Sequence, residues 1–382
     1  MMEPDEPATA HKERRHSCRR RSQRAKRHND SAFARRCHRH AARVCCSAAF
    51  GVGDRNVAAP CAPLDPGRLN CRVERVLIRS PEAAIEVTAM RPLLALLALA
   101  ASAFALTPEQ EQVPREADAP QPGLAKIVLL AGSPSNKAGQ HEYFAGCALM
   151  QQWLRAHPGT WPVLVADGWP RDERVLDGAK AVVCYMDGAA KLPFLTPERW
   201  AKLQRLVEGG AGLVMLHQCV DVPAAQAETI RGWLGGVWQA DIGSRGHWDM
   251  EFSKFPEHPI LRGVQPFAAP LDGWLFNLHF ADKGVTPLLA AQVPDKARTT
   301  ADAKAHAGRD EVIAWACERT GGGRAFGFTG CDLHRNWGVE SQRRLVVNGI
   351  LWSAGLEVPQ AGAAVPFTAA DLTRNLDDKR VP

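Results

Sequence analysis

The chain has 382 residues, with 47 Lys and Arg against 41 Asp and Glu, a formal net charge of +6. Residues 1–89 contain 18 Lys and Arg and 10 Asp and Glu, a net charge of +8, so the remaining 293 residues carry 6 − 8 = −2. Because a nucleic-acid-binding protein needs its basic charge on a folded surface, this distribution excludes nucleic acid as the partner of the main part of the chain.

Residues 1–89 are rich in Arg and have no apolar repeat of helical or strand period. Such a composition buries too little apolar surface to offset chain entropy, which predicts a disordered segment. We interpret it as upstream sequence that is translated from a start codon placed too early. A basic arm or an organelle transit peptide is the alternative interpretation.

A secretory signal begins at Met90. Met90-Arg91-Pro92 precedes a run of Leu and Ala over 93–101, and Ala103-Phe104-Ala105 supplies the small residues that a signal peptidase reads. The apolar run of about 15 residues is shorter than the roughly 20 that span a bilayer. We therefore expect residues 90–105 to be cleaved and the mature protein to be exported, periplasmic or secreted, without a membrane anchor.

The next part of the chain alternates between two kinds of segment. After a linker over 106–124, short apolar runs predict buried parallel strands at 126–131, 161–165, 179–185 and 212–217. Between them, residues 141–157 have apolar side chains at helical spacing, and Thr196-Pro197 begins a second helix that Gly209-Gly210 ends. The alternation predicts an α/β fold that is doubly wound, with a mostly parallel sheet covered on both faces.

Beyond about Gly236 the segments are shorter and rich in aromatic residues, at 247–252, 273–276, 285–293, 312–315 and 324–328. The last two flank a glycine-rich connection and predict a hairpin. A final helix over about 341–354 completes one domain over 125–358, and a C-terminal tail, 359–382, follows. The five cysteines beyond the signal have the spacing of no disulfide scaffold or zinc ribbon, and we expect no disulfide.

Candidate functional residues lie in loops that follow strands, because ligands of open α/β sheets bind beyond the carboxyl ends of the strands. The strand at 212–217 delivers His217 to this edge, where an imidazole suits acid/base catalysis or metal ligation. The loop after the first strand carries Ser133 and His141. The loop after 324–328 carries a polar and aromatic set, Thr329, Asp332, His334, Asn336 and Trp337. Tryptophan beside Asp, Asn and His is typical of a sugar site.

A metal site is a separate hypothesis. His247 and Asp249 share one face of a predicted strand, and with His258 they could join His217 around a divalent ion such as zinc, although this spacing defines no third ligand. The glycine run at 209–212 precedes a strand and that at 321–323 forms a hairpin tip, so neither predicts a phosphate cradle.

Several stretches resemble the ThuA-like family, which is named for trehalose utilisation. The resemblance covers roughly 126–358 and is carried by residues 209–217, 258–264, 272–277, 327–338 and 348–352. It implies a flavodoxin-like fold of the class I glutamine amidotransferase type, with His217 in the position of the amidotransferase cysteine. Glutaminase chemistry is not expected, because Cys219 lies two residues too late. The chain departs from the family pattern at Gly273, where an acidic residue is usual, and at Asp332, where a histidine is usual.

The sequence thus predicts an exported protein of carbohydrate utilisation that acts on a glycoside or an oxidised sugar by histidine-based acid/base chemistry. The predicted catalytic residues are His217, His334 and Asp332. The predicted substrate-binding residues are Ser133, His141, Trp274, Asn277, Thr329, Asn336 and Trp337. Two alternatives stay open: a non-catalytic sugar-binding protein in which His217 is structural, and an amidotransferase-like hydrolase that uses Cys219. The oligomeric state is left open as well.

Overall fold

A seven-stranded sheet forms the centre of the computed structural model, which describes residues 105–116 and 121–379. Along the sheet the order is β2-β1-β3-β4-β11-β10-β9. The strands are β1 Ala125–Ala131, β2 Thr160–Val165, β3 Ala181–Tyr185, β4 Gly212–Leu216, β9 Val285–Gln292, β10 Asp310–Glu318 and β11 Arg324–Phe328. The five neighbouring strands β2, β1, β3, β4 and β11 pair in parallel, whereas β10 is antiparallel to both of its neighbours.

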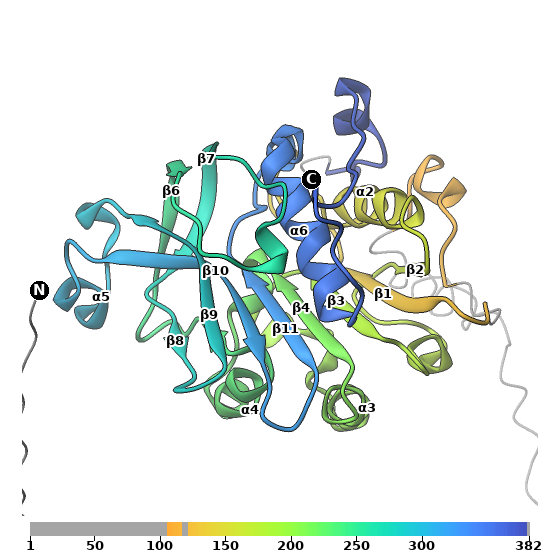
Figure 1. Cartoon of the computed structure of the whole chain (residues 1–382), viewed down its shortest axis with the longest axis horizontal. Helices are drawn as coiled ribbons and strands as arrows, with labels where there is room; N and C mark the ends of the chain where they lie inside the picture. The colour runs from red at the N-terminus through yellow and green to blue at the C-terminus, as the bar shows by residue number, and fades with distance from the viewer. Residues whose placement is uncertain (1–104, 117–120, 380–382) are drawn as a thin grey trace, which may run out of the picture. The chain divides into compact units, whose positions relative to one another are not determined.

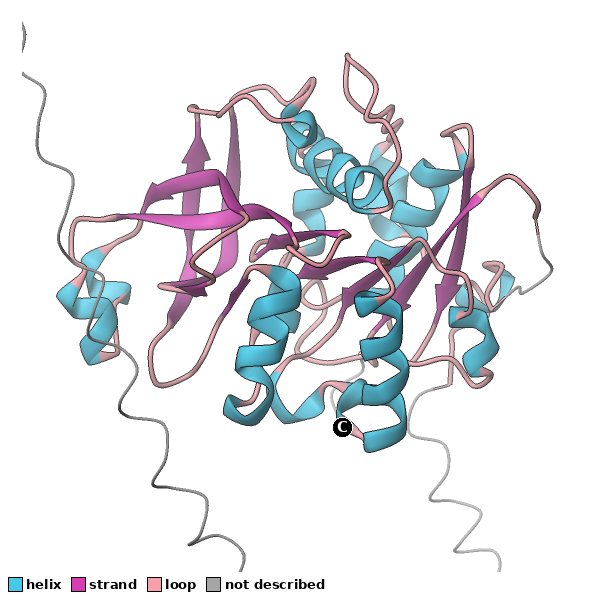
Figure 2. Cartoon of the chain, turned by 60° about the horizontal axis from the view of Figure 1, so that its bottom comes forward, coloured by secondary structure: helices cyan, strands magenta, loops and turns pink. Residues whose placement is uncertain are grey.

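The parallel strands are covered on both faces, as their sequence predicts. Every residue of β3 and β4 is buried, so these strands read as continuous apolar runs without alternation. Two apolar clusters lie on opposite faces of the sheet. The helices that contribute to them are α2 Tyr143–Arg155 and α6 Glu340–Ser353 on one face, and α3 Pro197–Glu208 and α4 Ala224–Leu234 on the other (Figures 1 and 2). This arrangement confirms the predicted doubly wound α/β class.

The helix α4 was not predicted from the sequence. The helix buries Ala227, Ile230, Trp233 and Leu234, and it ends at Gly235, whose φ of 88° is left-handed. A short amphipathic stripe with no side-chain N-cap is a weak local signal. Packing against the sheet supplies the stability that propensity does not.

The antiparallel part of the fold extends the sheet beyond β11. Strands β10 and β11 form the predicted hairpin, and β9 adds the edge strand. Beside them stands a separate two-stranded ribbon of β6 Ser244–Phe252 and β7 Phe267–Phe276 (Figure 1). The small elements of this part are β5 Gly236–Val237, β8 His279–Phe280 and α5 Ala301–Ala305. The ribbon matters for function because it carries His247 and Asp272.

The described parts of the predicted linker and tail pack on the domain. The buried Gln110 side chain donates hydrogen bonds to the Asn375 carbonyl and to Asp377 Oδ1, at 3.0 and 2.9 Å. The Trp153 indole donates to the Pro366 carbonyl at 2.8 Å. The packed unit therefore extends beyond the predicted limits of 125 and 358. The basic segment 1–89 and residues 90–104 of the predicted signal lie outside the described residues.

Candidate functional site

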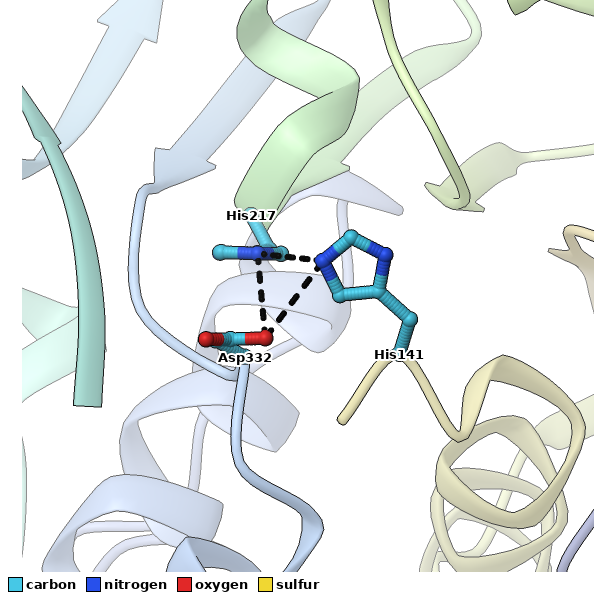
Figure 3. Close-up of side chains that lie close together, drawn as sticks. All are labelled: His141, His217 and Asp332. Carbon is cyan, nitrogen blue, oxygen red and sulfur yellow. Dashed lines mark hydrogen bonds and ion pairs between the residues drawn. The ribbon is translucent and has the colours of Figure 1, made fainter. Parts of the chain in front are cut away.

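Three side chains from different loops meet at the carboxyl edge of the sheet. His141 follows β1, His217 follows β4 directly, and Asp332 lies four residues after β11. The two Nε2 atoms are 3.2 Å apart, and Asp332 Oδ1 lies 3.4 Å from that of His141 and 3.6 Å from that of His217 (Figure 3). All three residues are buried. We call His141, His217 and Asp332 the edge cluster.

The backbone around the edge cluster is strained, and a hydrogen bond joins two of its loops. His141, His217 and Cys331 have φ values of 49°, 54° and 78°, in the left-handed region that costs a non-glycine residue about 1–3 kcal/mol. The His141 N–H donates to the Asp332 carbonyl at 3.1 Å, which ties the first loop to the last. Strain of this kind persists where the surrounding structure holds it and is concentrated at functional sites.

Asp272, on β7, holds the loop that carries Asp332. Its carboxylate accepts hydrogen bonds at 3.0 Å from the backbone N–H groups of Cys331, Leu333 and Gly273. Burial raises the pKa of Asp272 to about 6, although the bonds from Leu333 and Cys331 lower it. The ribbon of β6 and β7 thereby positions the loop that carries Asp332, and Cys331 of this loop lies more than 50 positions from Asp272 in the sequence.

Gly273 and Asp332 lie against each other. A Cβ atom at Gly273 would be 2.4 Å from Asp332 Oδ2 and 2.8 Å from Asp332 Cβ. No side chain therefore fits at position 273 while Asp332 keeps its place. The glycine and the aspartate are sterically coupled.

The tautomer of His217 follows from its hydrogen-bond partner. Its Nδ1 lies 3.0 Å from the Thr329 carbonyl, which can only accept, so this nitrogen carries the proton. Burial lowers the pKa of His217 to about 4, even though Asp332 raises it. At neutral pH the ring is thus uncharged, and the lone pair of Nε2 points into the edge cluster.

His141 is oriented in the same way by Asp187, which follows β3. His141 Nδ1 lies 3.0 Å from Asp187 Oδ1 and 2.9 Å from Ser135 Oγ. Asp187 also accepts from Tyr143 and Lys191, each at 2.7 Å. Burial raises the pKa of Asp187, but hydrogen bonds from His141, Lys191 and others outweigh it and hold the pKa well below its usual range. The carboxylate keeps the proton on Nδ1 of His141 and turns Nε2 toward His217.

The second oxygen of Asp332 contacts two further polar groups. Oδ2 lies 2.6 Å from His247 Nε2 and accepts from Gln140 Nε2 at 3.1 Å. The His247 side chain is half exposed, whereas that of Asp332 is buried. His247 therefore contacts both the buried edge cluster, through Asp332, and the solvent. The sequence did not indicate Asp187 or Gln140 as site residues, although Asp187 lies two residues after a predicted strand at the same edge.

Two cavities adjoin these residues. One has a volume of about 600 Å³ and is lined by His247, Gln140 and His334 together with four leucines, Leu271, Leu333, Leu372 and Leu376. The other, of about 460 Å³, is lined by His141 and by polar side chains that include Gln218, Asp221 and Arg245. Both volumes fall within the range of small-molecule sites.

Thr329, Asn336, His334 and Ser133 were also predicted as site residues, and none of them is a member of the edge cluster. Thr329 offers its carbonyl to His217, and Asn336 donates to the Pro270 carbonyl at 3.3 Å. His334 is buried beside the first cavity, and neither of its ring nitrogens has a hydrogen-bond partner among the described residues. Ser133 is exposed and lines a third cavity. Their predicted roles stay predictions.

Trp274, Trp337 and Asn277 lie inside the protein. The two tryptophan rings pack against other aromatic rings of the core and are at most 1% exposed, so neither presents a face to a ligand. Asn277 is buried and donates to Asp302 Oδ1 and to the Ile242 carbonyl. The aromatic and polar composition of these segments suggested a surface on which a sugar could stack. In the structure these three residues are buried, and they pack or form hydrogen bonds within the protein.

Two other sequence hypotheses meet physical obstacles. Cys219 is fully buried, and burial raises the pKa of its thiol well above the usual value, opposite to what an activated thiolate nucleophile requires. His258 accepts from the Ile260 N–H and packs on Trp352, and Asp249 accepts from the Leu271 N–H, so neither joins His217. All five cysteines among the described residues are free and buried. No helix in the described part of the chain is long and apolar enough to cross a membrane.

Comparison with known proteins gives matches to one sequence family and to several solved structures. A ThuA-like protein from Bacteroides uniformis is 16% identical, with a TM-score of 0.45 over 62% of this chain and 94% of that one. A second, from Parabacteroides merdae, is 17% identical, with a TM-score of 0.44 over 63% and 95%. A β-galactosidase from Rahnella sp. R3 is 12% identical, with a TM-score of 0.37 over 60% of this chain and 30% of that one. No curated protein matches.

One sequence family matches most of the described domain. The sequence model of the ThuA family, described as trehalose utilisation, matches residues 133–353. This range contains every member of the edge cluster, together with Asp187, His247 and Asp272. The match covers more than half of the chain, and it associates the protein with carbohydrate utilisation. The chain belongs to the ThuA family.

Proposed function

We propose that this protein is exported and acts as an enzyme on a carbohydrate, a glycoside or an oxidised sugar, at the edge cluster. The observation that carries the proposal is the convergence of two imidazoles and a carboxylate, buried at the carboxyl edge of the sheet and flanked by two cavities. Membership of the ThuA family supports a sugar as the substrate class.

His247 is the proton-transfer group in this proposal. Asp332 Oδ2 lies 2.6 Å from its Nε2, which fixes the ring, while its half exposure leaves the ring in reach of a ligand. The pair has the components needed to take a proton from a sugar hydroxyl, or from a carbon beside a sugar carbonyl. General acid or base catalysis of this kind contributes about 10²–10⁴-fold in rate.

Polar groups for sugar hydroxyls lie on the side of His141. Gln218, Asp221 and Arg245 line the cavity of about 460 Å³, and Asp221 Oδ2 lies 3.9 Å from Arg245 Nη1. Amide, carboxylate and guanidinium groups together supply both donors and acceptors, which a polyhydroxylated ligand needs. We expect the sugar to bind between this cavity and His247.

The test is turnover of disaccharides and of their keto derivatives by the full chain and by two histidine variants. His247→Ala should lower kcat by about 10²–10⁴-fold, because it removes the proton-transfer group. His279→Ala is the matched control, since His279 is exposed, lies outside the edge cluster, and has its ring Nδ1 3.4 Å from Gln239 Oε1. Equal turnover by His247→Ala and the wild type would reject the role of His247. Saturable sugar binding without turnover by the wild type would favour the non-catalytic alternative.

Export is tested separately. The proposal rests on the sequence from Met90 to Ala105. N-terminal sequencing of protein secreted by the native host should begin near Leu106. A sequence that reads through from Met1 would contradict both export by this signal and the interpretation of residues 1–89.

A further inference from the structure

Three electron-pair donors of the edge cluster face one another without a proton between them. His217 Nδ1 is protonated because its partner is a carbonyl, and His141 Nδ1 because its partner is the Asp187 carboxylate, so both Nε2 atoms present lone pairs at a separation of 3.2 Å. Asp332 Oδ1 is buried and has no hydrogen-bond partner among the described residues. Such an arrangement is repulsive unless a positive charge lies at its centre.

The geometry points to a divalent metal ion of the zinc class, bound by His141 Nε2, His217 Nε2 and Asp332 Oδ1. These three ligand atoms are 3.2, 3.4 and 3.6 Å apart. With bonds of about 2.1 Å, tetrahedral coordination separates ligand atoms by about 3.4 Å, and octahedral coordination by about 3.0 Å. The measured separations therefore match the tetrahedral case.

A single ion position satisfies all three bonds. A point about 2.1 Å from each ligand atom gives angles of about 99°, 108° and 118° at the metal, close to the tetrahedral value. Two histidines and one carboxylate leave a fourth position for water or a substrate oxygen, which is the pattern of catalytic rather than structural zinc sites. His141, one of the three ligands, also lines the cavity of about 460 Å³.

The surrounding contacts have the form that metal sites require. Metal-binding histidines donate their second ring nitrogen to a carboxylate or carbonyl, which fixes the tautomer and the ring orientation. Asp187 does this for His141, and the Thr329 carbonyl does it for His217. The outer oxygen of Asp332 is held by Gln140 and His247. Each of the three ligands is therefore oriented before any ion binds.

A proton shared between the two Nε2 atoms is the alternative to a metal. It would relieve the contact of the two nitrogens at 3.2 Å. It would still leave Asp332 Oδ1 at 3.4 Å or more from either nitrogen, beyond a good charge-assisted hydrogen bond. A metal ion satisfies all three atoms at once, and this difference favours the ion.

The experiment measures zinc directly in the full chain. Protein stripped with a chelator is titrated with Zn²⁺ at neutral pH against a chromophoric competitor, and Co²⁺ replaces zinc as a spectroscopic probe. We expect one zinc per chain and a cobalt spectrum with the visible absorption of four-coordinate geometry. Absence of stoichiometric zinc binding, or a cobalt spectrum of six-coordinate geometry, would overturn the inference.

Asp332→Asn is the decisive variant, because it keeps the shape of the side chain. Its amide oxygen can take the place of Oδ2 and accept from His247 and Gln140, while its NH₂ group, in the place of Oδ1, turns positive hydrogens toward the two Nε2 lone pairs in place of a negative charge. The variant should weaken zinc binding at least 100-fold, and without metal it should unfold at the same temperature as the stripped wild type or higher. His279→Ala should bind zinc as the wild type does. Equal zinc affinity of Asp332→Asn and the wild type would contradict the assignment.

The inference concerns the site of the proposed function but does not depend on turnover. Zinc binding that is lost in Asp332→Asn, in a protein that converts no sugar, would support the metal site and reject the enzyme. Sugar turnover that is unchanged after complete removal of metal would support the enzyme and reject the metal as a participant. His141→Ala and His217→Ala, checked for folding by circular dichroism, should each lose stoichiometric zinc binding.

Discussion

Gly273→Ala tests how closely β7 approaches the edge cluster. The new methyl group would lie 2.4 Å from Asp332 Oδ2, 2.8 Å from its Cβ and 2.9 Å from its Cγ, whereas ordinary van der Waals contact begins at 3.4 Å. Asp332 must therefore shift by about 3.4 − 2.4 = 1.0 Å. The backbone on either side of Asp332 cannot follow easily, because Asp272 accepts from both Cys331 and Leu333.

The size of the effect follows from these contacts. Overpacking of this kind costs about 1–3 kcal/mol, and rotation of Asp332 away from the methyl would instead break its bonds to His247 and Gln140 at a similar cost. We expect the free energy of unfolding to fall by about 2 kcal/mol. Because the shift of about 1 Å is large for a metal ligand or catalytic group, turnover or zinc affinity should fall by roughly 10²-fold.

The assay is urea unfolding followed by fluorescence, with Gly232→Ala as the matched control. Gly232 is exposed in α4, and a Cβ there meets nothing within 4 Å. Alanine in a helix interior is more favourable than glycine by about 0.5–1 kcal/mol, so this control should unfold at a higher urea concentration. If Gly273→Ala unfolded at the wild-type midpoint with wild-type activity, the steric coupling of Gly273 and Asp332 would be refuted.

Two further predictions concern buried carboxylates. Asp272→Ala leaves three backbone N–H groups without their acceptor and should destabilise the fold by about 3 kcal/mol or more, measured by urea unfolding; a loss below about 1 kcal/mol would mean that Asp272 does not hold the loop. Burial raises the pKa of Asp221 from 3.8 to about 6, so the folded state binds the proton more tightly, and the free energy of unfolding falls as pH rises from about 4 to about 6. Asp221→Asn should show a smaller decrease in Tm across this pH range, and identical profiles would contradict this origin of the decrease.

Much of the fold could be predicted from local sequence because its parallel strands are buried on both faces. The runs 127–131 and Gly212–Leu216 are apolar throughout, and each lies in a strand of the sheet. Thr196-Pro197 and Gly209 likewise define the ends of α3 from adjacent residues alone. The weakly patterned α4 was missed, because tertiary packing rather than local propensity stabilises it.

Part of the candidate site was also visible in the sequence. His141 and Asp332 each follow a predicted strand and His217 ends one, and the carboxyl ends of parallel strands share one edge. Strand order then decides which of the loop residues meet. The neighbouring positions of β1, β3 and β4 bring His141, Asp187 and His217 together, and parallel pairing of β11 with β4 adds Asp332.

Neighbouring residues alone are enough to predict the α/β class, the edge of the sheet that carries the polar loops, and the three histidine-bearing segments. The position of Asp332 between His141, His217 and His247, and the place of Trp274 and Trp337 in the core, depend on the folded chain. These contacts join residues 76 or more positions apart, such as His217 and His141. Local patterns carry no information on such distances, because the pairing of strands and the packing of β6 and β7 set them.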